Sequence, residues 1–126
     1  MKVLLAENRP DVRSALRLLL EQKPELTIIS EVAKINDLLE QLDKGCPDLV
    51  LLDWDLPGLE PADVLLRIRR CCPDLKIIAI SSRTESEKKA LAAGVDTFVS
   101  KADTPERLLT AIDYFLNPNP KSSTSQ

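Results

Sequence analysis

The stretch Leu49-Val50-Leu51-Leu52-Asp53 places four apolar side chains in a row before a carboxylate. Successive side chains of a strand point to opposite faces of its sheet, so a strand this apolar is buried on both faces. Such burial is typical of parallel strands covered by helices on each side. The runs Val3–Ala6 and Ile77–Ile80 repeat the pattern, and Thr27–Ser30 and Thr97–Val99 are further strand candidates.

Segments with helical periodicity follow each of these runs. Their apolar residues recur three and four positions apart, as on one face of an amphipathic helix. Gly94 is suited to end the fourth helix, and Asp103 or Thr104 can cap the fifth, ahead of Pro105. The apolar sets are Val12, Ala15, Leu16, Leu19 and Leu20; Ile35, Leu38, Leu39 and Leu42; Val64, Leu65 and Ile68; Ala90, Leu91 and Ala93; and Leu108, Leu109, Ile112, Phe115 and Leu116.

This alternation of strands and helices predicts an α/β fold. Right-handed crossovers between parallel strands give an open, doubly wound sheet, and five strands commonly take the flavodoxin-like order 2-1-3-4-5. We therefore expect one domain over residues 1–116, with five helices packed on a five-stranded parallel sheet. Residues 117–126, which are rich in Asn, Pro and Ser, are expected to form a linker or a disordered tail.

Composition narrows the class of protein. The chain has 126 residues and a net charge of −3, which suits one globular domain and argues against a broad basic surface for nucleic acid. Arg67, Arg69 and Arg70 are interpreted as the solvated side of a helix. No stretch approaches the ~20 apolar residues that cross a bilayer, and the first apolar run is too short for a secretory signal. We expect a cytoplasmic protein without a membrane partner.

The three cysteines are Cys46, Cys71 and Cys72. An odd count, no Cys-x-x-Cys motif and no signal peptide predict reduced thiols with an incidental structural role. Cys71 and Cys72 are adjacent, so they cannot both face the core from one helix. The sequence contains no His, and a zinc site would therefore need an unusual set of ligands.

Chemically capable side chains follow four of the five expected strands. Ligands of an open α/β sheet bind beyond the carboxyl ends of its strands, near the switch between the first and third strands. A single polar residue at a strand end is usually a solvated turn, but two acids, a hydroxyl and an amine at one edge indicate a site. The second strand ends in Glu31 and does not join this group. The group comprises Glu7 and Asn8, Asp53, Ser81 with Ser82, and Lys101.

Asp53 is placed where a carboxylate can accept a phosphoryl group and form an acyl phosphate. Such a transfer depends on positioning and on neutralising charge, and Mg²⁺ suits the hard oxygen ligands available here. Glu7, Asp53 and the backbone carbonyl of Asp55 can supply these oxygens. Lys101 can pair with Asp53 and then with a phosphoryl oxygen, and Ser81 can donate a hydrogen bond to another.

Short segments occur in a fixed order along the chain: Val3-Leu-Leu-Ala-Glu-Asn8, Pro47-Asp-Leu-Val-Leu-Leu-Asp53, Leu56-Pro57-Gly58, Ile77-Ile-Ala-Ile-Ser81, Ala93-Gly94 and Phe98-Val-Ser-Lys101. Together they resemble the receiver domain of bacterial two-component response regulators, over roughly residues 2–116. The resemblance implies that Asp53 is the phosphoacceptor, Ser81 the switch hydroxyl and Lys101 the amine that contacts the phosphate. It also implies that Phe98 changes rotamer on activation, with a plain core aromatic as the alternative. The segment from Lys101 to Leu109 resembles the subgroup that carries a helix-turn-helix DNA-binding domain.

The chain departs from the pattern of this family at the metal site and in two loops. Glu7 and Asn8 replace the usual pair of Asp, and the second member of that pair would touch the metal directly. A neutral Asn oxygen implies weaker Mg²⁺ binding and slow or metal-poor phosphorylation. Ala102 replaces the usual Pro, and a cis peptide there would cost ~3 kcal/mol, so we expect a trans bond. Pro61, where Gly is frequent, predicts a stiffer start to the third helix.

The resemblance also implies partners. A sensor histidine kinase or phosphotransfer protein would donate the phosphoryl group, and the chain would catalyse at most its own phosphotransfer and dephosphorylation. Homodimers would form through the fourth helix, the fifth strand and the fifth helix. DNA would be contacted through an output domain that this sequence does not contain. The charged residues of the predicted dimer surface are Lys88, Lys89, Asp96, Glu106, Arg107 and Asp113.

Two other functions stay open. A degenerate receiver would act as a protein-interaction module that does not depend on phosphorylation, and Asn8 is its main support. An aspartyl-phosphate hydrolase is the second, because Asp53-Trp54-Asp55 resembles the opening motif of haloacid-dehalogenase-type phosphatases. That family places the motif after its first strand and needs a later acidic pair and a cap, whereas Asp53 follows the third expected strand here.

Overall fold

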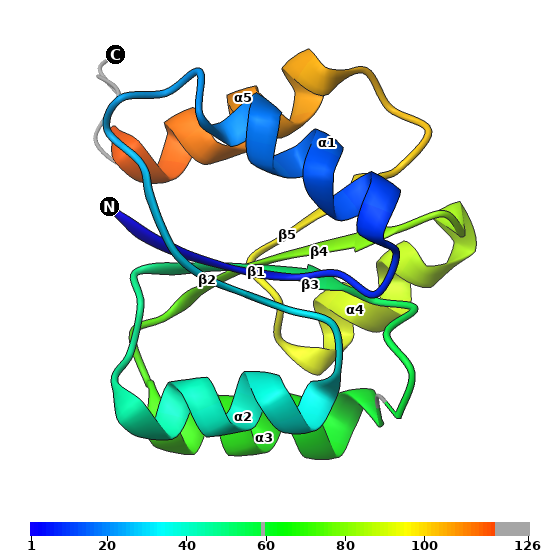
Figure 1. Ribbon diagram of the computed structural model, residues 1–126. Helices are drawn as coiled ribbons and strands as arrows, with labels where there is room; N and C mark the ends of the chain where they lie inside the picture. The colour runs from blue at the N-terminus through cyan, green and yellow to red at the C-terminus, as the bar shows by residue number, and fades with distance from the viewer. Residues whose placement is uncertain (59, 118–126) are drawn as a thin grey trace, which may run out of the picture.

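The computed structural model describes residues 1–58 and 60–117, without the side chains of Pro61 and Ala62. Strands and helices alternate in the predicted order, with a short 3₁₀ helix, η1 (Thr84–Ser86), before α4 (Figure 1). The strands are β1 (Lys2–Ala6), β2 (Thr27–Val32), β3 (Leu49–Asp53), β4 (Lys76–Ser81) and β5 (Thr97–Ser100). The helices are α1 (Pro10–Leu20), α2 (Ile35–Lys44), α3 (Pro61–Cys71), α4 (Glu87–Ala93) and α5 (Pro105–Leu116).

The strands form one parallel sheet in the order β2-β1-β3-β4-β5, which confirms the predicted flavodoxin-like fold. Figure 1 shows α1 and α5 on one face of this sheet and α2, α3 and α4 on the other. The winding reverses between β1 and β3, and in such sheets the carboxyl ends of these two strands border the binding crevice.

Alternate residues of β3 point into two separate hydrophobic clusters. Val50 and Leu52 join a cluster with side chains of α2 and α3, whereas Leu49 and Leu51 join one with side chains of α1 and α5. All four side chains are completely buried. Burial of each side chain contributes roughly 1.5–3 kcal/mol to the stability of the fold. An unbroken apolar run therefore stabilises a central strand that is covered on both faces, and not a strand that is covered on one face only.

Helix ends follow the predicted punctuation. Thr104 takes the N-cap position of α5, directly before Pro105 in the first turn, but its side chain makes no capping hydrogen bond. The Asp103 carboxylate instead accepts a hydrogen bond from the Ser100 N–H (3.1 Å), so it holds the turn after β5. Gly94 ends α4 with φ of 113°, a left-handed conformation that favours glycine.

The prediction of three reduced thiols is wrong, because a disulfide joins Cys46 to Cys72 across a Cα–Cα distance of 5.7 Å. Cys46 precedes β3 and Cys72 precedes β4, and since these strands are neighbours in the sheet, their entry loops meet. Cys72 also leaves the helical conformation (φ −134°, ψ 80°), and its side chain is buried. Cys71, the last residue of α3, keeps a free and exposed thiol.

No helix among residues 1–58 and 60–117 is long and apolar enough to cross a membrane. Residues 118–126, which make up most of the predicted tail, lie outside the described part of the chain. The basic residues of α3 are mostly solvated as predicted, since Arg67 and Arg70 are exposed. Arg69 is the exception, because it is half-buried and its guanidinium bonds to Asp96 (3.1 Å).

Candidate functional site

The carboxyl ends of β1, β3, β4 and β5 meet at one edge of the sheet, toward the right in Figure 1. The register of β1 and β3 places Glu7 and Asp53 at adjacent strand ends. Ser81 and Ser100 pair where β4 and β5 end, and the N–H of Lys101 donates to the Ser81 carbonyl (2.8 Å). The structure therefore brings together Glu7, Asp53, Ser81 and Lys101, which with Asp55 form the acid pocket.

Asp53 ends β3 and is 2% exposed. Its Oδ1 accepts hydrogen bonds from the Lys101 ammonium (3.2 Å) and from the N–H of Asp55 (2.9 Å). No group in the described residues donates a hydrogen bond to its Oδ2. One oxygen of this carboxylate is thus anchored, and the other is left for a ligand.

Glu7 is fully buried next to Asp53. Its Oε2 accepts hydrogen bonds from the Arg9 N–H (3.1 Å) and from the Lys101 ammonium (3.4 Å). Its Oε1 lies 3.1 Å from the Lys101 nitrogen as an ion pair, yet it takes no hydrogen bond within the described chain. Burial and the Asp53 charge raise the pKa of Glu7, against the opposing effects of the Arg9 N–H and Lys101. The pocket therefore holds more negative charge than one ammonium satisfies.

Lys101 supplies that ammonium from the turn after β5. Its side chain is 17% exposed, and its nitrogen lies between the carboxylates of Glu7 and Asp53. Burial disfavours its charge, but these two carboxylates outweigh burial and raise the pKa of Lys101. The turn is fixed by the Ala102 N–H, which donates to the Ser100 hydroxyl (3.1 Å). The peptide before Ala102 is trans, as expected from the absence of Pro.

The Ser81 hydroxyl is held by a carboxylate to which the sequence prediction gave no role. It donates to Asp55, with both carboxylate oxygens at 3.2 Å, and accepts from the Arg83 N–H (3.0 Å). The hydroxyl of Ser82 donates to the same carboxylate (3.2 Å), and the Arg83 guanidinium lies 3.9 Å from it. The prediction used only the backbone carbonyl of Asp55, although an acid two residues after Asp53 was a visible signal.

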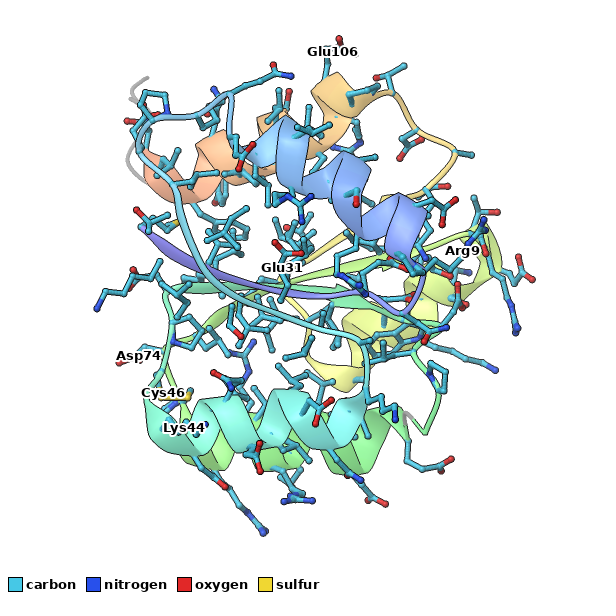
Figure 2. The ribbon with its side chains drawn as sticks, viewed as in Figure 1. Arg9, Glu31, Lys44, Cys46, Asp74 and Glu106 are labelled. Atoms are coloured by element: carbon cyan, nitrogen blue, oxygen red, sulfur yellow. A yellow bond between two sulfur atoms is a disulfide. The ribbon has the colours of Figure 1, made fainter. Side chains whose placement is uncertain are left out.

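The other predicted residues lie at the margin of the pocket or away from it. Asn8 is exposed in the loop after β1. Phe98 is 6% exposed within the core, and a cavity of about 140 Å³ adjoins it. Glu31 stays outside the site as predicted, because it pairs with Arg17 on α1 (3.1 Å). Glu31 lies on β2, at the side edge of the sheet, and Figure 2 shows Arg9 toward the right, where the carboxyl ends of the strands lie.

The oxygens of the acid pocket fit a hard divalent cation. The fit is indicated by Glu7 Oε1, a buried oxygen without a hydrogen bond among the described residues, and by two buried carboxylates that share one ammonium. Mg²⁺ takes carboxylate and carbonyl oxygens, so Glu7, Asp53 and the backbone carbonyl of Asp55 are suitable ligands. Asn8 follows Glu7 in the adjoining loop and is exposed.

A groove of about 700 Å³ between α1 and α5 adjoins the acid pocket. Its walls include Leu16 and Leu108, and Lys101 lies at its edge, but Glu7 and Asp53 do not line it. The groove is therefore a neighbouring surface and not the place where the two acids act.

Two charges of the predicted dimer surface are already paired within the chain. Asp96, between α4 and β5, bonds to Arg69 of α3 (3.1 Å). Asp113 of α5 bonds to Lys23 in the loop after α1 (2.8 Å). These two acids are thus less available to a partner than the sequence pattern implies.

A family profile described as the response regulator receiver domain matches residues 3–113. Among curated proteins, the transcriptional activator protein ExaE of Pseudomonas putida is 32% identical over 114 residues, which are 89% of this chain and 53% of that protein. The nitrate/nitrite response regulator protein NarL of Escherichia coli (strain K12) is 29% identical over 112 residues, which are 87% and 52%. The chain thus spans about half the length of these relatives.

Solved structures agree with the fold. A two-component response regulator of the LuxR family from Aurantimonas sp. SI85-9A1 superposes with a TM-score of 0.84 at 26% identity, over 93% of this chain and 85% of that one. The isolated REC domain of RcsB from Salmonella enterica serovar Typhimurium, in the presence of phosphomimetic BeF₃⁻, gives a TM-score of 0.84 at 23% identity, over 93% and 88%. The second likeness is evidence of the fold alone.

Proposed function

This chain belongs to the response regulator receiver domain family, and we propose that it accepts a phosphoryl group on Asp53 from a histidine kinase or phosphotransfer protein. The observation that carries this proposal is the Asp53 carboxylate, which is 2% exposed and bonded through Oδ1 to Lys101. Its Oδ2 takes no hydrogen bond from the described residues. A carboxylate oriented in this way is suited to act as a nucleophile.

In the transfer step, Oδ2 of Asp53 attacks the phosphorus of the donor's phosphohistidine. An O–P bond forms, and the P–N bond breaks with its electron pair remaining on the imidazole nitrogen of the donor. The Lys101 ammonium, 3.2 Å from Oδ1, stabilises the negative charge of the phosphoryl oxygens. Attack by water on the same phosphorus later returns free phosphate and the carboxylate. The chain is thus a signalling domain that acts only on its own side chain.

Mg²⁺ would be held by Glu7, Asp53 and the backbone carbonyl of Asp55, with Asn8 as a neutral neighbour. When bound, it would neutralise charge on the phosphoryl oxygens. The buried Oε1 of Glu7, which lacks a hydrogen bond within the described chain, supports this ligand set. Because Asn8 carries no charge, we expect weaker binding than a second carboxylate would give.

Ser81 and Phe98 would convey phosphorylation to the partner-binding surface. The Ser81 hydroxyl, now bonded to Asp55 at 3.2 Å, would exchange that acceptor for a phosphoryl oxygen. Asp55 would keep its bonds to Ser82 and the neighbouring Arg83. The cavity of about 140 Å³ beside Phe98 leaves space for a second orientation of its ring.

Regulation of transcription is the output that we propose. The matched relatives are named as a transcriptional activator and as a nitrate/nitrite response regulator. A net charge of −3 makes this chain a poor ligand for DNA, so a helix-turn-helix output domain would make that contact. We place the protein in the cytoplasm, with dimers that form through α4, β5 and α5.

Phosphorylation is tested with acetyl phosphate and Mg²⁺, followed by intact mass. We expect the wild type to gain one phosphoryl group and Asp53→Asn to gain none. Asp74→Asn removes an exposed acid and is the matched control, which should behave like the wild type. No gain by the folded wild type with acetyl phosphate or phosphoramidate, at any Mg²⁺ concentration, contradicts the proposal and favours the degenerate receiver.

A further inference from the structure

Three sulfur atoms meet at the amino edge of the sheet, at the opposite end of the strands from Asp53. The Sγ atoms of Cys46, Cys71 and Cys72, here termed the sulfur cluster, all lie within 4.8 Å of one another. Figure 2 shows Cys46 at the end of the molecule opposite Arg9. We propose that the reduced chain binds one thiophilic divalent cation, of which Zn²⁺ is the probe, through these three sulfurs.

The backbone brings the three sulfurs together from two loops. Cys46 lies in the loop that enters β3, whereas Cys71 and Cys72 lie where α3 gives way to the loop that enters β4. Adjacent residues of one helix would point about 100° apart. Because α3 ends at Cys71 and Cys72 is extended (φ −134°, ψ 80°), both side chains turn toward Cys46. The arrangement thus depends on the end of the helix and not on a Cys-x-x-Cys loop.

The separations suit a metal held by thiolates. Zn–S bonds of about 2.3 Å in a tetrahedral site place two sulfurs about 3.8 Å apart. The Cys71 sulfur lies within 4.8 Å of the other two, which is close to this value, whereas the bonded sulfurs of Cys46 and Cys72 would have to move apart on reduction. A thiol or phosphine reductant must first supply two electrons to the Cys46–Cys72 disulfide, and two protons from water complete the two thiols, which lose these protons again when they bind the cation. The disulfide and the metal therefore exclude each other. Cys72 is 2% exposed and Cys71 is exposed, which gives a buried ligand with an open entry path.

The backbone groups around the cluster favour a cation over a reactive thiolate, although Lys44 and Arg70 lie in the last turns of α2 and α3. The C-terminal ends of α2 and α3 both reach the cluster, and such ends carry partial negative charge. The Cys71 thiol donates to the Leu42 carbonyl (3.4 Å), and the Cys71 carbonyl oxygen lies 3.4 Å from the Cys46 sulfur. Reactive thiolates are typically found beside helix N-termini or cationic side chains. A bound cation satisfies these groups, whereas a bare thiolate is repelled by them.

Asp43 provides the fourth ligand in our proposal. Its Oδ1 lies 3.9 Å from the Cys71 sulfur. An oxygen and a sulfur on one tetrahedral Zn²⁺ are about 3.6 Å apart, given Zn–O distances of about 2.1 Å. Three thiolates and one carboxylate make a closed four-coordinate site without His, which this sequence lacks.

The test uses the full chain, reduced with a phosphine and desalted without oxygen. We expect native mass spectrometry to show one Zn²⁺ per reduced chain, and Co²⁺ to give the charge-transfer absorption of bound thiolates. Competition with a chromophoric chelator should show that Cys71→Ser, which keeps Cys46 and Cys72, binds Zn²⁺ about tenfold or more weakly. Asp43→Asn should weaken binding severalfold, whereas its control Asp74→Asn should not. Circular dichroism verifies the fold of each variant.

Three outcomes would overturn the proposal. The first is a folded, reduced wild type that takes up no Zn²⁺ or Co²⁺. The second is Zn²⁺ affinity in Cys71→Ser equal to that of the wild type. The third is equal Zn²⁺ uptake by the oxidised chain, in which Cys46 and Cys72 are joined. Equal affinities of Asp43→Asn and Asp74→Asn would overturn the assignment of the fourth ligand. None of these measurements depends on phosphorylation, so failure of the metal proposal can be distinguished from failure of the proposed function.

Discussion

The acid pocket and the sulfur cluster lie at opposite ends of the same strands and differ in how far their side chains are exposed to solvent. Glu7 and Asp53 are 0% and 2% exposed, so their charges face one another and Lys101 with little screening. Cys46 and Cys71 of the sulfur cluster are exposed. In the acid pocket, the buried side chains are thus the charged ones that a ligand would contact. The sulfurs are placed by the ends of two helices, and only Cys72 among them is as buried as Asp53.

The largest expected effect comes from Lys101→Met, which leaves Glu7 and Asp53 without an ammonium. We expect the free energy of unfolding at pH 7 to fall by about 2–3 kcal/mol, since an uncompensated buried charge is costly. The pKa of Lys101 is raised in the folded chain, so its ion pairs are fully present at pH 7. Urea denaturation of both proteins at pH 7 and near pH 4 measures the difference.

The loss should shrink toward pH 4, because Glu7, whose pKa is raised, then takes up a proton in the folded chain. Lys76→Met removes an exposed lysine and is the control, which should leave stability within about 0.5 kcal/mol. An equal loss at both pH values would mean that packing, and not charge, is what Lys101 supplies. The Zn²⁺ affinity of reduced Lys101→Met should equal that of the reduced wild type. A different affinity would mean that the acid pocket and the sulfur cluster are energetically coupled.

The second effect concerns Mg²⁺. Asn8→Asp restores a second charged oxygen to the loop after β1, and we expect Mg²⁺ to bind about tenfold more tightly. Trp54, the single Trp of the chain, adjoins Asp53 and reports binding through its fluorescence. Asn117→Asp makes the same charge change at the end of α5 and should have no effect. If Asn8→Asp binds Mg²⁺ with the affinity of the wild type, residue 8 is not part of the metal site.

A smaller effect is expected from Asp55→Ala, which frees the Ser81 hydroxyl and removes a carboxylate from beside the phosphoryl site. BeF₃⁻, a phosphoryl mimic, should bind about threefold to tenfold more tightly to this variant than to the wild type. Trp54 fluorescence again measures the affinity. Asp37→Ala removes an exposed acid of α2 and is the control. Weaker BeF₃⁻ binding in Asp55→Ala would show that Asp55 positions Ser81 for phosphate and does not compete with it.

The smallest effect is on stability. The pKa of Glu7 is raised by burial, so the folded chain binds its proton more tightly than the unfolded chain does. Its charge therefore costs stability above the folded pKa, and Glu7→Gln should be slightly more stable than the wild type at pH 7. The gain should vanish below about pH 4, where Glu is protonated in both states. Glu31→Gln, which breaks a pair with Arg17, should instead lose stability, and a loss in both variants would contradict this account.

The same contrast explains what could be predicted from the sequence. Parallel strands bring their carboxyl ends to one edge, so residues such as Glu7, Asp53 and Lys101 could be grouped from strand order alone. The role of the Asp55 carboxylate could not be predicted from strand order, because its hydrogen bond from Ser81 depends on the path of a loop.

The sulfur cluster could not be predicted from Cys spacing. Its sulfurs converge because α3 ends between Cys71 and Cys72, and boundaries of this kind are uncertain by one or two residues. A shift of one residue in that end would point Cys72 elsewhere. Strand ends are fixed by a whole sheet, whereas this cluster depends on where two helices, α2 and α3, end.

The link between Cys46 and Cys72 closes a ring of chain that contains Asp53. Under non-reducing conditions, the tryptic peptide with Asp53 (residues 45–67) stays attached to the peptide with Cys72 (residues 71–76). A search for the phosphorylated fragment at its simple mass would then fail even with complete modification. Peptide mapping of this protein therefore has to begin with reduction and alkylation. The relevant tryptic cuts follow Lys44, Arg67, Arg70 and Lys76.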